Sequence, residues 1–220
     1  MRALRRSARL APRVLSRGPV VRAALVPTQA GPLAGDHDRV RLHVGAGATL
    51  VLVPIAATVA LPGAARSVLE LDATVEAGGR LVLDEPTLIV AEGADVVRRT
   101  RIELGPGAIA LVRDIVVLGR DGEGPGRLDS VLRATLDGAP LLHDALLIEP
   151  AAADAHVALA PGHRVIGTAC LLGARGDGDG ALAGPGALRR ATGPDLPTVE
   201  AALAPFHPAS AAEPTGSRVG

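Results

Sequence analysis

The chain has 220 residues and no net charge, because its 23 basic side chains balance its 23 acidic ones. It is rich in aliphatic residues and contains no Trp or Tyr and a single Phe. Its basic residues other than histidine are all arginines. Nucleic-acid binders usually carry a basic surplus, and single-strand binders add aromatic stacking platforms, so this composition argues against a nucleic-acid partner.

The first 22 residues form a basic segment, with seven arginines and no acid from Arg2 to Arg22. Such a segment superficially resembles a transit or twin-arginine signal, but arginines, prolines and Gly18 interrupt every apolar run. We interpret it as a solvated or partner-facing segment. No apolar stretch approaches the length of a membrane span, so we expect no membrane association and a cytoplasmic location.

Strands are predicted through the middle of the chain. Val40, Leu42 and Val44 alternate with Arg39, Arg41 and His43, and the same period of two recurs over residues 68–76 and 96–104. In the last of these segments, Arg98 and Thr100 share the face of Val96, Ile102 and Leu104. Shorter apolar runs predict further strands at residues 48–53, 81–83, 109–118, 131–136 and 141–148.

A weak internal repeat follows the strands. Residues 44–48, 75–79 and 104–108 each contain an apolar residue, a short Gly-containing turn and the start of a new strand, with a looser copy at 159–163. The spacing of about 30 residues is typical of stacked repeat units. The sequence therefore predicts a mainly β fold of stacked strands with one or two short helices. Alternation alone does not separate a sandwich from a β-helix.

The C-terminal part is predicted to be less regular. Cys170 lies among apolar residues, which indicates a buried structural thiol. Residues 173–193 are rich in Gly, Ala and Asp and predict a loop. A short helix follows, with Asp195 at its N-cap and Pro197 in its first turn. We expect a single domain over residues 1–205 and a disordered tail over 206–220.

One cluster has the chemistry of a metal site. Asp36, His37 and Asp38, with His43 nearby, bring carboxylates and imidazoles together, and such groups bind borderline metals such as nickel or zinc. The alternative is a polar turn that leads into a half-exposed strand.

Catalytic motifs are not evident in the chain. The Gly-rich segment 119–126 lacks the Lys and Ser/Thr of a phosphate-binding loop, and we interpret it as a tight turn held by an Arg–Glu pair. Asp84 and Glu85 point to opposite faces of an extended backbone, which argues against a shared acid–base role. The residues alone therefore predict a β-rich protein that is not an enzyme.

Several motifs occur together in the order typical of one family. They include Gly-Pro-Leu-x-Gly-Asp at 31–36, Asp-Glu-Pro at 84–86, Leu-Gly-Arg-x-Gly-Glu at 118–123 and Asp-Gly-Ala-Pro-Leu at 137–141. On these motifs the chain resembles the UreD (UreH) family of urease accessory proteins over most of residues 10–147. The resemblance implies a β-helical, non-catalytic protein with two layers of stacked strands and few helices. It also implies that the protein acts with UreF and the GTPase UreG on apo-urease to enable nickel insertion.

The resemblance also implies positions for that role. Asp36, Glu85, Arg120 and Glu123 lie in the matching motifs and are candidates for nickel passage or for an interface. Nickel would be handled transiently, without a tightly bound cofactor. Two alternatives remain at this point. One is a β-solenoid or cupin-like metal-dependent enzyme built on His37, His43 and Asp36 or Asp38, and the other is a structural β-module without a metal role.

Overall fold

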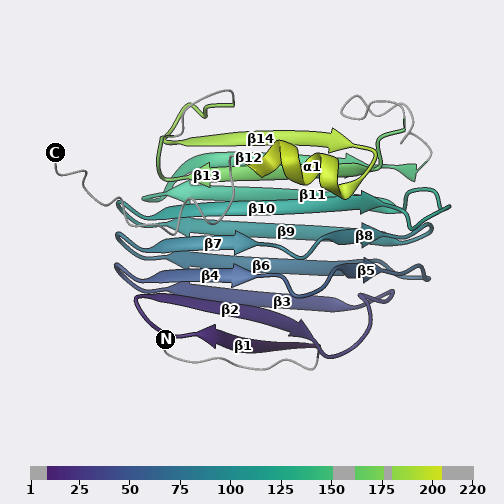
Figure 1. Ribbon diagram of the computed structural model, residues 1–220, viewed down its shortest axis with the longest axis horizontal. Helices are drawn as coiled ribbons and strands as arrows, with labels where there is room; N and C mark the ends of the chain where they lie inside the picture. Colours follow the sequence, from purple (N-terminus) through teal and green to yellow (C-terminus); the bar gives the residue numbers. More distant parts are fainter. Residues whose placement is uncertain (1–8, 151–161, 176–179, 205–220) are drawn as a thin grey trace.

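The chain folds into two facing sheets of stacked strands (Figure 1). The computed structural model describes residues 9–150, 162–175 and 180–204. The larger sheet has nine strands in the order β1-β2-β4-β7-β10-β13-β14, with β5 and β8 joined beside β10, and the smaller sheet has the order β12-β11-β9-β6-β3. The strands are β1 (Leu10–Ser16), β2 (Val20–Pro27), β3 (His37–Val44), β4 (Thr49–Val53), β5 (Thr58–Ala60), β6 (Ser67–Val75), β7 (Arg80–Asp84), β8 (Leu88–Val90), β9 (Asp95–Leu104), β10 (Ile109–Leu118), β11 (Arg127–Leu136), β12 (Ala139–Ile148), β13 (Val165–Leu172) and β14 (Gly186–Gly193).

Most strands pair in parallel with the equivalent strand of the next coil. In the smaller sheet β3, β6, β9 and β11 are parallel neighbours, and in the larger sheet β2, β4, β7 and β10 are. Antiparallel pairs lie at the two ends of the stack, β1–β2 at one and β11–β12 and β10–β13–β14 at the other. This parallel stacking makes the fold a β-solenoid rather than a sandwich of hairpins, and it confirms the mainly β, stacked-strand prediction.

The predicted repeat is the corner at which the chain passes from one sheet to the other. Gly47, Gly78 and Gly107 occupy it with φ of 63°, 65° and 65°, a left-handed conformation that favours glycine. Successive corners are joined by backbone hydrogen bonds, since the Gly47 N–H donates to the Ala77 carbonyl at 3.0 Å and the Gly78 N–H to the Pro106 carbonyl at 2.9 Å. Each corner thus fixes the position of the next coil along the stack.

Aliphatic side chains at equivalent positions of successive coils form the core between the sheets. Val44, Val75 and Leu104 stand in register in the smaller sheet, and Leu52, Leu83 and Val112 do so in the larger one. All belong to one buried cluster, which also contains Cys170. Cys170 is 1% exposed, which confirms the predicted buried thiol, and this burial raises the pKa of the thiol to about 12.

One short helix, α1 (Leu196–Leu203), lies across β13 and β14 on the outer face of the larger sheet (Figure 1). The Asp195 carboxylate accepts a hydrogen bond from the Thr198 N–H at 2.9 Å and caps the helix as predicted. Val199 and Leu203 are its buried residues.

Two segments differ from the sequence-based expectation. The predicted loop over 173–193 was wrong in its last part, because Gly186–Gly193 forms β14 beside β13. The partly buried Leu188 of this strand packs against the core. Part of the basic N-terminal segment forms the β1–β2 hairpin, in which Ala11 and Ala23 are buried while Arg13 and Arg22 stay exposed. The tail predicted over 206–220 lies outside the described residues, as does most of the fourth repeat copy at 159–163.

Candidate functional site

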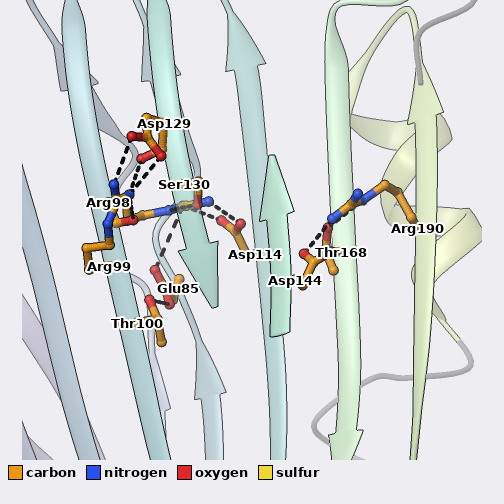
Figure 2. Close-up of polar contacts among 10 residues, drawn as sticks. All are labelled: Glu85, Arg98, Arg99, Thr100, Asp114, Asp129, Ser130, Asp144, Thr168 and Arg190. Atoms are coloured by element: carbon orange, nitrogen blue, oxygen red, sulfur yellow. Dashed lines mark hydrogen bonds and ion pairs between the residues drawn. The ribbon is translucent and has the colours of Figure 1, made fainter. Parts of the chain in front are cut away.

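A row of charged and hydroxyl side chains runs between the two sheets, through an interior that is otherwise aliphatic. It passes from Glu85, after β7, to Arg98 on β9 and Asp114 on β10, and then to Asp144 on β12 and Arg190 on β14 (Figure 2). Because these strands follow one another through the stack, the row runs along the direction in which the coils are piled (Figure 1).

Arg98 makes the largest number of polar contacts in the row. Its guanidinium forms a two-pronged ion pair with Asp114, in which Nη1 donates to Oδ1 at 2.5 Å and Nη2 donates to Oδ2. Its Nε donates to the Ser130 hydroxyl at 3.1 Å, and Nη1 lies 3.9 Å from the Glu85 carboxylate. Only 6% of Arg98 is exposed, and a buried charge is tolerated because it is paired on several sides.

Burial dominates the chemistry of Glu85. It raises the pKa of the Glu85 carboxyl from 4.5 to about 7, against the opposing effect of the Arg98 charge. The Thr100 hydroxyl lies 3.3 Å from Glu85 Oε1. Glu85 therefore exchanges its proton near neutral pH, whereas Asp84 next to it points outward and pairs with Arg113 at 2.7 Å. The prediction that the two acids face opposite ways is confirmed.

Two cavities adjoin the row. A cavity of about 130 Å³ lies on the Glu85 side, where aliphatic residues of the core line it together with polar residues that include Arg9, Asp38, Glu85, Arg98 and Thr100. A smaller one of about 20 Å³ lies on the other side, lined by Arg98, Asp114, Ser130, Asp144, Thr168, Cys170 and Arg190 among others. In the smaller cavity Arg190 donates to Asp144 at 2.5 Å and to the Thr168 hydroxyl at 3.3 Å.

The larger cavity continues the row toward the N-terminal end of the stack. Arg9 pairs there with both Asp36 and Asp38, at 2.9 Å from the Asp38 carboxylate. The complete row thus holds five carboxylates and three guanidiniums, which is an excess of one negative charge when Glu85 is protonated and of two when it is ionised. An interior with that excess favours a divalent cation over an anion.

The structure brings three of the predicted site residues together. Asp38 and Glu85 line the larger cavity, and Asp36 shares Arg9 with Asp38. His37 and His43 lie on the outer face of β3, where they contact Glu70 at 2.9 Å and Glu76 at 2.8 Å. Because side chains alternate along a strand, Asp38 points to the opposite side from both histidines. Within the described part of the chain, no group of three or more metal-binding side chains is found.

Arg120 and Glu123 lie apart from the row, in the turn after β10. Glu123 accepts hydrogen bonds from the Arg120 side chain at 2.8 Å and from the Arg120 and Glu92 backbone N–H groups at 3.0 and 3.3 Å. The side-chain hydrogen bond from Arg120 is the main cause that lowers the pKa of Glu123 to about 2. The predicted Arg–Glu turn is confirmed, and the contacts give both residues a structural part in it.

Sequence reasoning did not assign Arg98, Asp114, Asp144 and Arg190 to the site. One signal was present, because Arg98 stands on the apolar face of its strand, where a charge is unexpected. Asp114 likewise interrupts the inward face of the long apolar run over 109–118. Whether these four side chains meet depends on which strands of successive coils lie next to one another. The residue pattern of a single strand does not reveal that.

Comparison with known proteins gives this arrangement a context. The family model described as UreD urease accessory protein matches residues 3–208. The chain belongs to the UreD family. It is 41% identical over 190 residues to urease accessory protein UreD 1 of Streptomyces griseus, covering 83% of this chain and 74% of that protein. It is 39% identical over 196 residues to urease accessory protein UreD of Streptomyces coelicolor, covering 81% and 77%.

The UreD relatives are named as accessory proteins rather than enzymes, which confirms the prediction of a non-enzymatic protein. The family model also extends the likeness beyond residues 10–147, to β13, β14 and α1. Among the described residues, the one helix has eight residues and is too short to cross a membrane.

Proposed function

We propose that this UreD-family protein enables nickel insertion into apo-urease, and that nickel passes along the interior row of charged side chains. It does so in the cytoplasm, in a complex with UreF-like and UreG-like accessory proteins. The observation that carries the proposal is the row itself, in which acidic side chains outnumber basic ones between two sheets that are otherwise packed with aliphatic residues.

The chemistry of the row suits a cation that is passed on rather than kept. Carboxylate oxygens and hydroxyls coordinate divalent cations, but the carboxylates of Asp36, Asp38, Asp114 and Asp144 are each paired with an arginine. A cation entering the row competes with those guanidiniums, which weakens its binding. Weak and repeated binding is what a conducting route requires, because each site has to release the ion it accepts.

The alternative of a metal-dependent enzyme is less well supported. It requires His37, His43 and an aspartate of the same segment to converge on one ion. The two histidines lie six residues apart on the outer face of β3, and each contacts a different glutamate. Asp38 points inward, toward Arg9. We therefore place nickel handling inside the solenoid.

Deletion and complementation of the gene in a urease-positive host, at fixed nickel supply, test the proposed function. We expect cells without the gene to contain urease protein that is poor in nickel and inactive, and the re-introduced gene to restore both. Unchanged urease activity and nickel content in the deletion strain would reject the function.

A further inference from the structure

Arg98 is the only residue that lines both interior cavities among those the structure describes. Its side chain extends from β9 toward Asp114 (Figure 2), which lines the smaller cavity. Glu85 and Thr100 lie on the side of the larger cavity, and Asp114 and Ser130 on the side of the smaller one. Arg98 is thus the side chain that the linings of the two cavities have in common.

The position of the guanidinium is one that a cation can occupy. Its Nη1 atom lies 2.5 Å from Asp114 Oδ1 and 3.9 Å from Glu85 Oε2. An ion at that point would have one carboxylate oxygen near bonding distance and a second one within reach of a small side-chain movement. Arg98 and a passing metal ion therefore compete for the same carboxylates.

We propose that Arg98 is the gate of the interior row, and that a divalent cation crosses between the cavities only when it displaces the Arg98 guanidinium from Asp114. This inference rests on the proposed function and specifies how passage along the row is controlled. The released guanidinium has a second acceptor in Glu85, on the side of the larger cavity, 3.9 Å from Nη1 in its present position. The gate has two positions because Arg98 has a carboxylate on each side.

Arg99 provides a matched control for Arg98. It is the next residue of β9 and also forms a two-pronged ion pair, with Asp129 at 2.9 and 2.8 Å. Because side chains alternate, that pair lies on the outer face of the smaller sheet. Replacing Arg98 or Arg99 by methionine (R98M or R99M) removes one positive charge from β9 in each case. R98M removes it from the inner face of the sheet and R99M from the outer face.

Equilibrium dialysis of the isolated full-length protein against nickel chloride tests the gate. We expect R98M to bind one nickel ion at least about tenfold more tightly than the wild type, because the carboxylates lose their competitor. We expect R99M to bind as the wild type does, and R98M/D114N to lose the gain because it lacks the main carboxylate. Equal nickel affinity of R98M and wild type, or an equal gain in R99M, would overturn the proposal.

A variant that keeps the charge covers the case in which R98M does not fold. The lysine introduced by R98K retains one positive charge but cannot form the two-pronged pair, so Asp114 is only partly neutralised. We expect R98K to have a nickel affinity between those of the wild type and R98M, and a wild-type affinity for R98K would overturn the gate. The dialysis contains no urease, so its result stands apart from the deletion experiment that tests the proposed function.

Discussion

At the scale of single residues, the face of the strand on which an arginine lies decides whether its ion pair is buried or exposed. Arg98 and Arg99 are neighbours on β9 with similar ion pairs, yet Arg98 is 6% exposed and faces the cavities. Exposed pairs contribute about 0–1 kcal/mol, whereas removing one partner of a buried pair costs roughly 3–5 kcal/mol. Replacing a whole buried pair by apolar residues is nevertheless often neutral or stabilising, because the charges lose their hydration on burial. Stability alone therefore does not explain the interior row, and we attribute its presence to function.

Glu85→Gln is expected to change how stability depends on pH. The pKa of Glu85 is 4.5 when unfolded and about 7 when folded, chiefly because the carboxyl is buried. The folded state thus holds the extra proton between those values, and stability falls as pH rises through this window. The shift corresponds to roughly 3 kcal/mol of folding free energy, which the wild type loses as pH rises through this window and E85Q should keep.

Urea unfolding of wild type and E85Q from pH 4.5 to 8 measures this difference. We expect the free energy of unfolding of E85Q, relative to that of the wild type, to increase as pH rises to about 7. Above pH 7 the difference between the two proteins should stay constant. Parallel curves over the whole range would show that burial does not raise the pKa of Glu85.

Glu123→Ala is expected to loosen the turn after β10. Glu123 accepts from the backbone N–H groups of Arg120 and Glu92, so its removal leaves both amides without that acceptor. Hydrogen exchange should become faster at both amides and stay unchanged in the core of β10. Asp121→Ala, which removes a neighbouring exposed acid, is the control. Unchanged exchange in E123A would contradict the structural part given to Glu123.

At the scale of elements, the corners set the position of each coil along the stack. The sequence predicted most strands because their apolar residues alternate, and it predicted α1 from Asp195 and Pro197. It did not predict β14, whose small residues weaken the alternation. Strand pairing with β13, rather than local propensity, decides the conformation of that segment.

Gly78→Ala tests the importance of the corners. Gly78 has φ of 65° and no atom within 4 Å of an added Cβ, so the cost is conformational and amounts to about 1 kcal/mol. Gly45→Ala, in an equivalent corner, is the control, because Gly45 is not left-handed and an added Cβ has its nearest contact at 3.9 Å. We expect a lower urea midpoint for G78A only, and equal midpoints would contradict this account of the repeat.

At the scale of the whole molecule, stacking creates the site. The repeat at 44–48, 75–79 and 104–108 was sufficient to predict stacked units. Asp114, Asp144 and Arg190, however, belong to three strands of the two sheets, β10, β12 and β14, whose relative positions depend on the antiparallel pairing at one end of the solenoid. The sequence predicted Asp36, Asp38 and Glu85 individually, and only the fold shows that they share one interior with Arg98.

The nickel content of urease purified from cells that carry an interior variant tests the central claim most directly. D38N/E85Q removes two carboxylates from the larger cavity, and the control D72N/D129N removes two from the outer face. We predict that D38N/E85Q lowers nickel per urease by about tenfold and activity in parallel, and that the control matches the wild type. Equal nickel content with both variants, each present at wild-type level, would contradict passage through the interior.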